Sequence, residues 1–156
     1  MAIALARQQR AKIIINDRVD IALALRADGI HLGQTDLPPE YARKILGPDA
    51  IIGFSTHSIE QAVVAARLPV DYLAIGPVFS TNTKENPAPA IGLDRLRDVR
   101  EAVGDLPLVA IGGITLMNLP GVFETGVDSA AMVGALISDP ATITVNFARF
   151  GSLTSK

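Results

Sequence analysis

The chain has 156 residues, a formal net charge of −2, apolar residues at 49% of positions and no cysteine. This length suits one domain over residues 1–156, and the lack of cysteine excludes disulfides, thiolate metal sites and cysteine nucleophiles. Interspersed charges without a basic stripe argue against nucleic-acid binding. No apolar run approaches the roughly 18 residues of a membrane span, and no signal-peptide pattern opens the chain. A cytoplasmic protein with no membrane or nucleic-acid partner is expected.

Apolar strand runs and helical patterns alternate along the chain. The first strand contains the continuous β-branched run Ile13-Ile14-Ile15, typical of a strand buried on both faces. Strands are predicted at residues 12–16, 29–32, 51–54, 71–75, 108–111 and 129–133. Helices are predicted at 2–9, 19–25, 39–46, 58–67, 92–103, 116–125 and 141–150, with Ser58 as the cap of the fourth. Strict alternation of this kind predicts a parallel sheet.

Repeated joints between a helix and the next strand favour a barrel over an open sheet. Asp28 and Asp128 each stand directly before a strand and after small or apolar residues, and Asp71, at the start of the fourth strand, echoes this pattern. Such short joints belong at the bottom of a (β/α)₈ barrel, where the sequence serves stability. No G-x-G-x-x-G follows the first strand, so a dinucleotide-binding fold has little support. The expected fold class is α/β, a (β/α)₈ TIM-barrel type truncated to about six βα units.

Two aspartates follow neighbouring strands at one edge of the predicted sheet. Asp17 comes after the first strand and Asp36 after the second, where α/β folds hold ligands. Together they suit one hard cation such as magnesium. Asp17 has the alternative role of capping the next helix, and Asp36 that of closing an Asx-turn. When the two aspartates are considered together, a metal site is the favoured interpretation.

The two histidines carry weaker signals. His57 lies at the end of the third strand, close to Ser55, whose hydroxyl can donate to an anion. His57 is either a general base or a rim histidine that bonds to the backbone, and the second is favoured because no acid is an evident orienting partner. His31 alternates with apolar neighbours in its strand and is expected to be a satisfied core histidine.

Three segments suit phosphate groups. The longest irregular stretch, residues 76–91, carries Thr81, Thr83 and Lys84, whose hydroxyls and ammonium suit a phosphate or diphosphate, although a plain solvated loop is the alternative. The glycine pair in IGGIT, residues 111–115, lets the backbone approach a ligand closely, and its threonine is expected to cap the next helix. A Val-Gly turn at residues 133–134 follows the last strand. Barrel enzymes often bind phosphate after their last two strands, which favours phosphate over tight turns alone.

The motifs IIINDRVD, DGIHLGQTDLP, IIGFSTHS, DYLAIGPVFSTNTK and PLVAIGGIT resemble, in order and spacing, the thiamine-phosphate synthase family and its relative thiazole tautomerase. The resemblance implies a transferase that joins hydroxymethylpyrimidine diphosphate to thiazole phosphate, releasing pyrophosphate, with Mg²⁺. It implies magnesium ligands at Asp17 and Asp36. It also implies diphosphate contacts at Asn16, Ser55 and Lys84, the last two catalytic. Thr81 and Thr83 are implied thiazole-phosphate contacts, and Gly113 with the turn at Val133 and Gly134 is an implied phosphate-binding backbone.

The sequence departs from this family in two respects. Gly134 stands where many relatives have a serine, so one hydroxyl contact to phosphate is in doubt. The family also has two βα units, with a glutamine-arginine-lysine cluster, before the point that corresponds to Met1. The chain alone is therefore expected to have little synthase activity. Its first and last strands would present unpaired edges, so either a homo-oligomer or a protein of low stability is expected.

Two alternatives to a synthase stay open. A thiazole tautomerase of the same fold relies on a histidine at the position of His57 and tends to lack the acid at the position of Asp36. A non-catalytic phosphate-binding module would bind ligand without turnover. Retention of Asp36 and of the pair Gly76-Pro77 favours the synthase.

Overall fold

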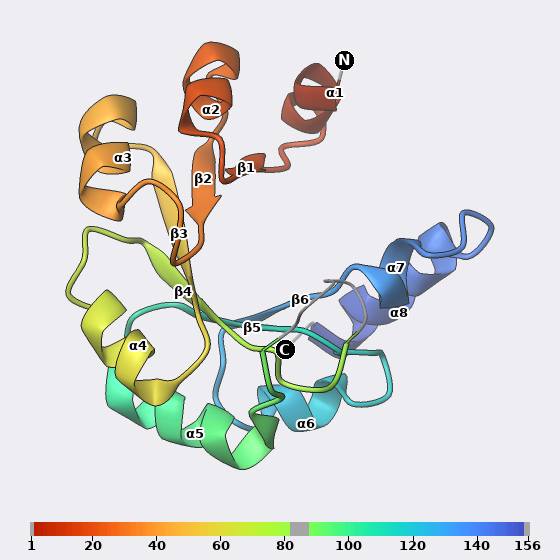
Figure 1. The fold of residues 1–156 in the computed structure, drawn as a ribbon. Helices are drawn as coiled ribbons and strands as arrows, with labels where there is room; N and C mark the ends of the chain where they lie inside the picture. Colours follow the sequence, from red (N-terminus) through yellow and green to blue (C-terminus); the bar gives the residue numbers. More distant parts are fainter. Residues whose placement is uncertain (1, 82–87, 155–156) are drawn as a thin grey trace.

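The computed structural model describes residues 2–81 and 88–154, and in them six parallel strands form one sheet in the order β1-β2-β3-β4-β5-β6 (Figure 1). The strands are β1 (Ile14–Asn16), β2 (Gly29–Leu32), β3 (Ile51–Thr56), β4 (Tyr72–Ile75), β5 (Leu108–Ile111) and β6 (Ser129–Ala131). The helices are α1 (Ala2–Gln8), α2 (Val19–Leu25), α3 (Pro39–Leu46), α4 (Ile59–Ala65), α5 (Gly92–Val103), α6 (Leu119–Phe123), α7 (Gly134–Ile137) and α8 (Ile143–Thr154). The predicted alternation of strand and helix is confirmed.

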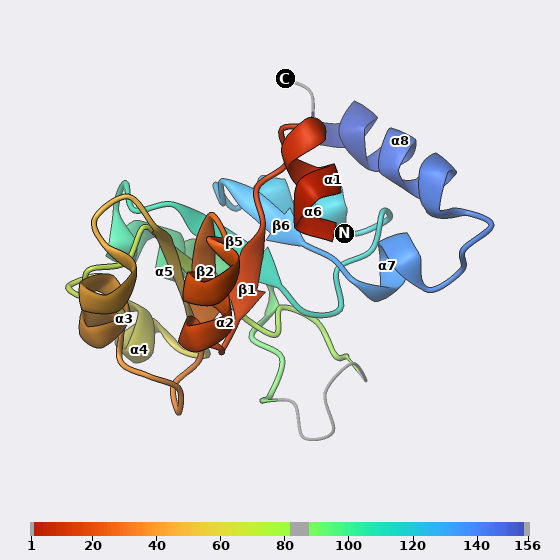
Figure 2. The ribbon, with the colours of Figure 1, turned by 90° about the horizontal axis from the view of Figure 1, so that it is seen from above.

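The sheet curls without closing. In the described part of the chain, β1 pairs only with β2 and β6 pairs only with β5. Helices α2 to α6 cover the convex side, and the concave side opens between the end that carries α1 and α2 and the end that carries α7 and α8 (Figures 1 and 2). The expected barrel of about six βα units is therefore confirmed as a curled half-barrel.

Three helices near the C-terminus differ from the predicted ones, and the last of them, α8, spans Ile143–Thr154 where residues 141–150 are predicted. Helix α6 starts at Leu119 rather than at residue 116, because Thr115 and Asn118 first close a turn of their own by reciprocal hydrogen bonds. The prediction that Thr115 is the helix cap is therefore wrong, since Asn118 holds that position. The short helix α7 follows β6 where the sequence predicts only a turn. No helix in residues 2–81 and 88–154 is long and apolar enough to cross a bilayer.

The start of α4 is fixed as predicted. Ser58 is the N-cap, and its Oγ accepts a hydrogen bond from the amide of Gln61 at 3.3 Å. The Gln61 side chain returns to accept from the amide of His57 at 2.8 Å, one residue earlier than in a standard capping box. This reciprocal pair fixes the direction in which the chain enters α4, and with it the place of His57 on the rim.

The apolar core lies between the convex face of the sheet and the helices. Fully buried strand side chains on this face include Ile30, Leu32, Ile52, Leu73 and Leu108. Each such side chain contributes about 1.5–3 kcal/mol through burial. Strand β5 shows the alternation clearly, because its first and third residues are buried while its second and fourth, on the concave face, are partly exposed. The concave face is therefore where side chains remain available for contacts with a ligand.

Three aspartate joints fasten the bottom of the half-barrel, as the repeated sequence pattern predicts. Asp28, Asp71 and Asp128 each precede an even-numbered strand and accept a hydrogen bond from the first amides of the odd-numbered strand before it. The pairs are Asp28 with the amide of Ile13, Asp71 with that of Ile52, and Asp128 with that of Leu108, at 2.9, 2.7 and 2.8 Å. Each carboxylate also pairs with a base, namely Lys12, Arg43 and Arg100 respectively. The joints therefore set the strand register far from the rim.

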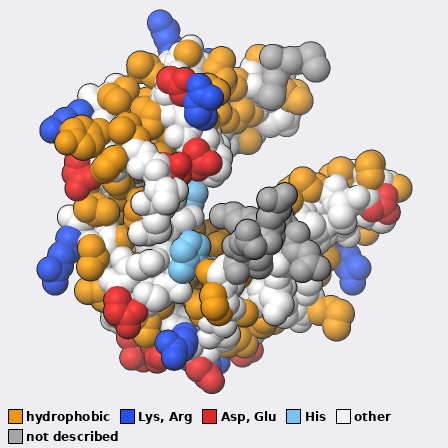
Figure 3. All heavy atoms as spheres, in the orientation of Figure 1, with side chains coloured by type: hydrophobic (Ala, Val, Ile, Leu, Met, Phe, Trp, Pro, Cys, Tyr) orange, Lys and Arg blue, Asp and Glu red, His pale blue; other side chains and the backbone are white. Residues whose placement is uncertain are grey.

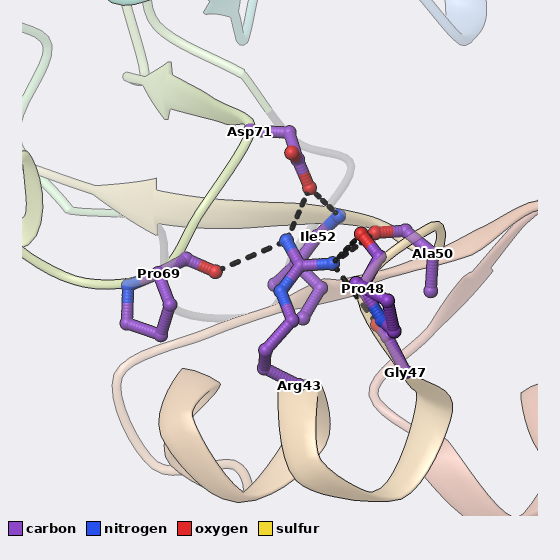
Figure 4. Close-up of polar contacts among 7 residues, drawn as sticks. All are labelled: Arg43, Gly47, Pro48, Ala50, Ile52, Pro69 and Asp71. Carbon is purple, nitrogen blue, oxygen red and sulfur yellow. Dashed lines mark hydrogen bonds and ion pairs between the residues drawn. The ribbon is translucent and has the colours of Figure 1, made fainter.

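Arg43 makes the most extensive of these joints (Figure 4). Its guanidinium donates to the carbonyl oxygens of Gly47, Pro48 and Ala50 on one side. On the other side it donates to the carbonyl of Pro69, at 3.2 Å, and to Asp71 Oδ2, at 2.6 Å. The planar fork of an arginine can meet several acceptors in this way, whereas a lysine ammonium cannot. One side chain thus ties the end of α3 to the joints before β3 and β4.

The Asp28 joint predicts an acid dependence of stability. The hydrogen bond from Lys12, followed by the one from the amide of Ile13, holds the pKa of Asp28 below its usual range. Stability from the ionised Asp28 is therefore present above the unfolded-state pKa of about 3.9 and is lost as the pH falls through the lower folded-state pKa. Asp28→Asn should flatten the loss of stability below a pH of about 4. Urea unfolding at a series of pH values checks this, with Asp49→Asn, in the exposed turn before β3, as control. An unchanged acid profile would contradict it.

Candidate functional site

A cavity of about 690 Å³ lies at the carboxyl ends of β3 to β6, on the open side of the half-barrel. In the space-filling view this side is a hollow in which histidine side chains are visible (Figure 3). The cavity is lined by residues 55–57 after β3, by Gly76, Pro77, Ser80, Thr81 and Ala88 after β4, by residues 111–115 after β5 and by residues 131–135 after β6. It therefore brings together five of the predicted site residues: Ser55, Thr81, Gly113, Val133 and Gly134. Two others, Thr83 and Lys84, lie outside the described residues.

The two predicted metal ligands are tied to the carboxyl end of the same strand, β2. Asp17 follows β1 with a φ of +61°, and its amide donates to the carbonyl of His31 at 2.9 Å. Asp36 lies in the loop after β2, where its Oδ2 accepts from the amide of Gly33 at 2.6 Å. Asn16, the last residue of β1, is exposed and stands beside His31 in the register. Asp17 is thus bonded through its backbone amide to His31 of β2, and Asp36 is bonded through its carboxylate to Gly33, just beyond the end of β2.

The structure gives different outcomes for the alternative roles of the two acids, which are helix capping for Asp17 and a local turn for Asp36. Helix α2 starts at Val19 with Arg18 at the cap position, so Asp17 stands one residue before the cap. Asp36 closes a local turn, because its amide also reaches the carbonyl of Gly33 at 3.3 Å. Neither acid lines the cavity described above, and Asp17 instead borders a shallower groove of about 520 Å³ between α2 and α3. A metal site at these acids stays a prediction.

Ser55 is held from two directions. Its Oγ lies 2.8 Å from Nε2 of His31, and its carbonyl accepts from the side-chain amide of Gln34. Nδ1 of His31 lies 2.9 Å from the hydroxyl of Tyr72. Both ring nitrogens of His31 are therefore bonded, as predicted for a satisfied histidine. The ring belongs to the concave face, however, and not to the apolar core.

His57 bonds to the backbone, as favoured above. Its Nδ1 lies 2.6 Å from the carbonyl oxygen of Gly76 across the rim. Because a carbonyl only accepts, Nδ1 carries the proton, and in the neutral ring Nε2 then bears the lone pair. His57 lines the cavity, so the ring joins the β3 and β4 ends of the rim.

The glycine pair after β5 is shaped for close backbone approach. Gly112 and Gly113 have φ values of +94° and +65°, which side-chain-bearing residues rarely adopt. A Cβ on Gly113 would lie 2.6 Å from the carbonyl oxygen of Ser80. Asn118 holds this loop, since its Nδ2 donates to the carbonyl of Gly113 at 3.1 Å and its Oδ1 accepts from the amide of Thr115 at 2.8 Å. The loop after β5 is therefore packed directly on the loop after β4.

The sequence analysis misses two residues that support the site: Tyr72, at the start of β4 beneath the cavity, and Asn118, in the loop after β5. Tyr72 begins a strand in which alternation puts it on the face opposite Leu73, so its concave position is readable once β4 is aligned. Asn118 stands three residues after Thr115, the spacing of a local side-chain turn. In both cases a sequence signal exists, but only the structure shows the partners, which are His31 for Tyr72 and the loop at Gly113 for Asn118.

Parallel βα units with a ligand-sized cavity at the carboxyl ends of the strands define a protein of the (β/α)₈-barrel class. The profile of the family described as thiamine monophosphate synthase matches residues 1–136. The thiamine-phosphate synthase of Koribacter versatilis is 51% identical over 128 residues, covering 82% of this chain and 60% of its own. That of Desulfitobacterium hafniense (strain Y51) is 49% identical over 134 residues, covering 86% and 64%. The chain belongs to the thiamine monophosphate synthase family.

The solved structures agree with this assignment. The thiamine phosphate pyrophosphorylase from Pyrococcus furiosus superposes with a TM-score of 0.86 at 38% identity, over 97% of this chain and 71% of that one. The chain spans about three fifths of the length of the first curated relatives that it matches. The family and the fold predicted from the motifs are therefore confirmed.

Proposed function

We propose that this chain acts as a thiamine-phosphate synthase, a transferase that joins hydroxymethylpyrimidine diphosphate to thiazole phosphate and releases pyrophosphate. The observation that carries the proposal is the cavity at the ends of β3 to β6, which unites Ser55 with the glycine loop at Gly113. The relatives named above support the reaction. Asp36, which the tautomerase tends to lack, favours the synthase over that alternative.

The groups on the rim suit an ionising displacement. Departure of pyrophosphate would leave positive charge on the pyrimidine methylene carbon, and the thiazole nitrogen would then form the new bond there. The protein needs no nucleophile for this, only groups that stabilise the leaving diphosphate. Ser55 would donate its hydroxyl to the diphosphate, together with Asn16 and Lys84. Backbone at Gly113 and at residues 133–134 would hold the thiazole phosphate, with Thr81 and Thr83.

The proposed magnesium ligands are the carboxylates of Asp17, which follows β1, and of Asp36, which follows β2. Mg²⁺ is commonly bound through one or two carboxylates with the remaining positions filled by water and substrate phosphate oxygens. We assign Asp17 and Asp36 as that pair; the described residues hold no cluster of three or more His, Cys, Asp or Glu side chains, so water and substrate oxygens would have to complete the coordination. The bound ion would neutralise charge on the diphosphate. A cytoplasmic location likewise stays a prediction.

Replacing either acid tests the metal proposal. Asp17→Asn and Asp36→Asn should each weaken magnesium-dependent pyrophosphate binding at least about tenfold, because a carboxylate–cation contact is worth no less than a charge-assisted hydrogen bond. Calorimetry measures the binding, and circular dichroism checks that the fold is kept. Asp20→Asn, an exposed acid in the first turn of α2, is the matched control. Equal binding in all four proteins would remove the metal site.

The open edges of the sheet predict low activity of the 156-residue chain by itself. β1 and β6 each have one neighbouring strand in the described residues, so their outer backbone groups are available for association with a second copy. In a direct assay with both substrates, we expect the chain to form thiamine phosphate far more slowly than the Koribacter versatilis synthase. Light scattering should give a mass above 16.4 kDa if the chain associates, and otherwise thermal unfolding should show low stability. Equal rates from a stable monomer would contradict the prediction.

A further inference from the structure

A row of polar and aromatic side chains crosses the concave face directly beneath the cavity. The strand register pairs His31 of β2 with Gly53 of β3, and Gly53 with Tyr72 of β4, so these positions share one face. A Cβ on Gly53 would lie 2.0 Å from Cζ of Tyr72, which means that the phenol ring occupies the space above this glycine. The His31 and Tyr72 rings stack with centroids 5.4 Å apart. Gly53 thus makes room for the two rings to meet.

The row leads to the cavity through Ser55. Ser55 lies two residues beyond Gly53 on β3, hence on the same face, and it lines the cavity. Tyr72 OH, Nδ1 and Nε2 of His31, and Ser55 Oγ form an unbroken chain with contacts of 2.9 and 2.8 Å. The carbonyl of the same His31 accepts from the amide of Asp17. One histidine therefore links the two halves of the rim.

This chain of hydrogen bonds can run in two directions, and only one of them leaves Ser55 able to donate. A neutral imidazole has one donor and one acceptor nitrogen. When Tyr72 donates to Nδ1, Nε2 carries the proton and donates to Ser55 Oγ, which leaves the serine hydroxyl proton free to point into the cavity. In the reverse order, Ser55 donates to Nε2 and shows an approaching anion only lone pairs. Burial raises the pKa of Tyr72, which favours the protonated phenol that the first order requires.

We infer that His31 and Tyr72 are positioning residues that hold the Ser55 hydroxyl as a donor toward an anionic phosphate or diphosphate group in the cavity. The inference rests on the proposed function for the identity of the anion. It adds two residues that do not line the cavity and that act through Ser55, which does. The order of donation is from Tyr72 to His31, from His31 to Ser55, and from Ser55 to the anion.

The tautomer of His31 tests the direction without any ligand. ¹⁵N NMR of the labelled chain should show His31 protonated at Nε2 and unprotonated at Nδ1. Tyr72→Phe keeps the ring and its stacking but removes the donor, so His31 should lose this preference. Tyr41→Phe changes the only other tyrosine, which is exposed on α3, and should leave the spectrum unchanged. Protonation of His31 at Nδ1 in the parent chain, or no response to Tyr72→Phe, would overturn the inference.

Binding of inorganic pyrophosphate with magnesium tests the effect on Ser55. Ser55→Ala should lower the affinity about tenfold and Tyr72→Phe about threefold, as expected for losing and for misorienting one hydrogen bond to a charged group. The double variant should bind no more weakly than Ser55→Ala alone, because Tyr72 acts through that hydroxyl. Additive losses would show a merely structural role and overturn the inference. If the parent chain binds no pyrophosphate, the proposed function fails, and the tautomer measurement alone decides on the positioning role.

Discussion

Arg43→Met should destabilise the protein by about 2–4 kcal/mol, one of the two largest effects expected for a single substitution. The guanidinium holds five acceptors at the joints before β3 and β4, among them Asp71. With the arginine removed, the carbonyl oxygens lose their donor and the Asp71 carboxylate loses its countercharge. Partial exposure moderates the effect, since the side chain of Arg43 is 20% exposed and that of Asp71 is 46% exposed. Urea or thermal unfolding measures the change.

Two further variants test whether the loss comes from the hydrogen bonds of the Arg43 guanidinium. Arg43→Lys keeps the charge but loses the fork, so it should recover only a minor part of the stability. Arg97 forms an exposed ion pair with Asp94 within α5. Arg97→Met should therefore lower the free energy of unfolding by less than about 1 kcal/mol. A loss for Arg43→Met no larger than for Arg97→Met would show that the joint contributes nothing beyond a surface ion pair.

Gly113→Ala should both destabilise the protein and damage the cavity. At a φ of +65° an alanine is strained by about 1–2 kcal/mol. Its Cβ would also lie 2.6 Å from the carbonyl oxygen of Ser80 and 2.7 Å from Cβ of Phe79, so the loop after β4 must move away. Together these effects should cost about 2–4 kcal/mol and reduce the affinity for inorganic phosphate at least about tenfold. Thermal unfolding and phosphate titration measure the two losses.

Gly134→Ala is the matched control for this variant. Gly134 lines the same cavity and starts α7, but a Cβ there meets nothing within 4 Å. Alanine at this position should leave stability within about 0.5 kcal/mol of the parent. If Gly113→Ala behaved like Gly134→Ala in both measurements, the tight contact between the loops after β4 and β5 would not shape the site.

Much of the fold follows from local patterns. Five predicted elements match the structure at both ends: the strands at residues 29–32 and 108–111, and the helices at residues 19–25, 39–46 and 92–103. Each has sharp boundaries in the sequence, such as Pro39 at a first helical position and Gly104 just past a helix end. Boundaries fail where side chains make their own bonds, as at Thr115 and Asn118. There the hydrogen-bonded turn replaces the first helical turn that the apolar pattern predicts, so α6 starts three residues after the predicted position.

The candidate site separates what the sequence determines from what the tertiary structure determines more clearly than the fold does. The sequence by itself determined the family, the bottom joints at Asp28, Asp71 and Asp128, and the residue types on the rim, because these depend on neighbours in the chain and on strand order. Only the tertiary structure decided that the Asp17–Asp36 pair lies outside the cavity that holds Ser55. It also decided that Tyr72 meets His31. Those two rings stand 41 residues apart in the chain, and their contact depends on strand register, sheet curvature and the space above Gly53 that the Tyr72 ring fills. No local pattern encodes these three quantities, since each arises from how separate strands pack on one another.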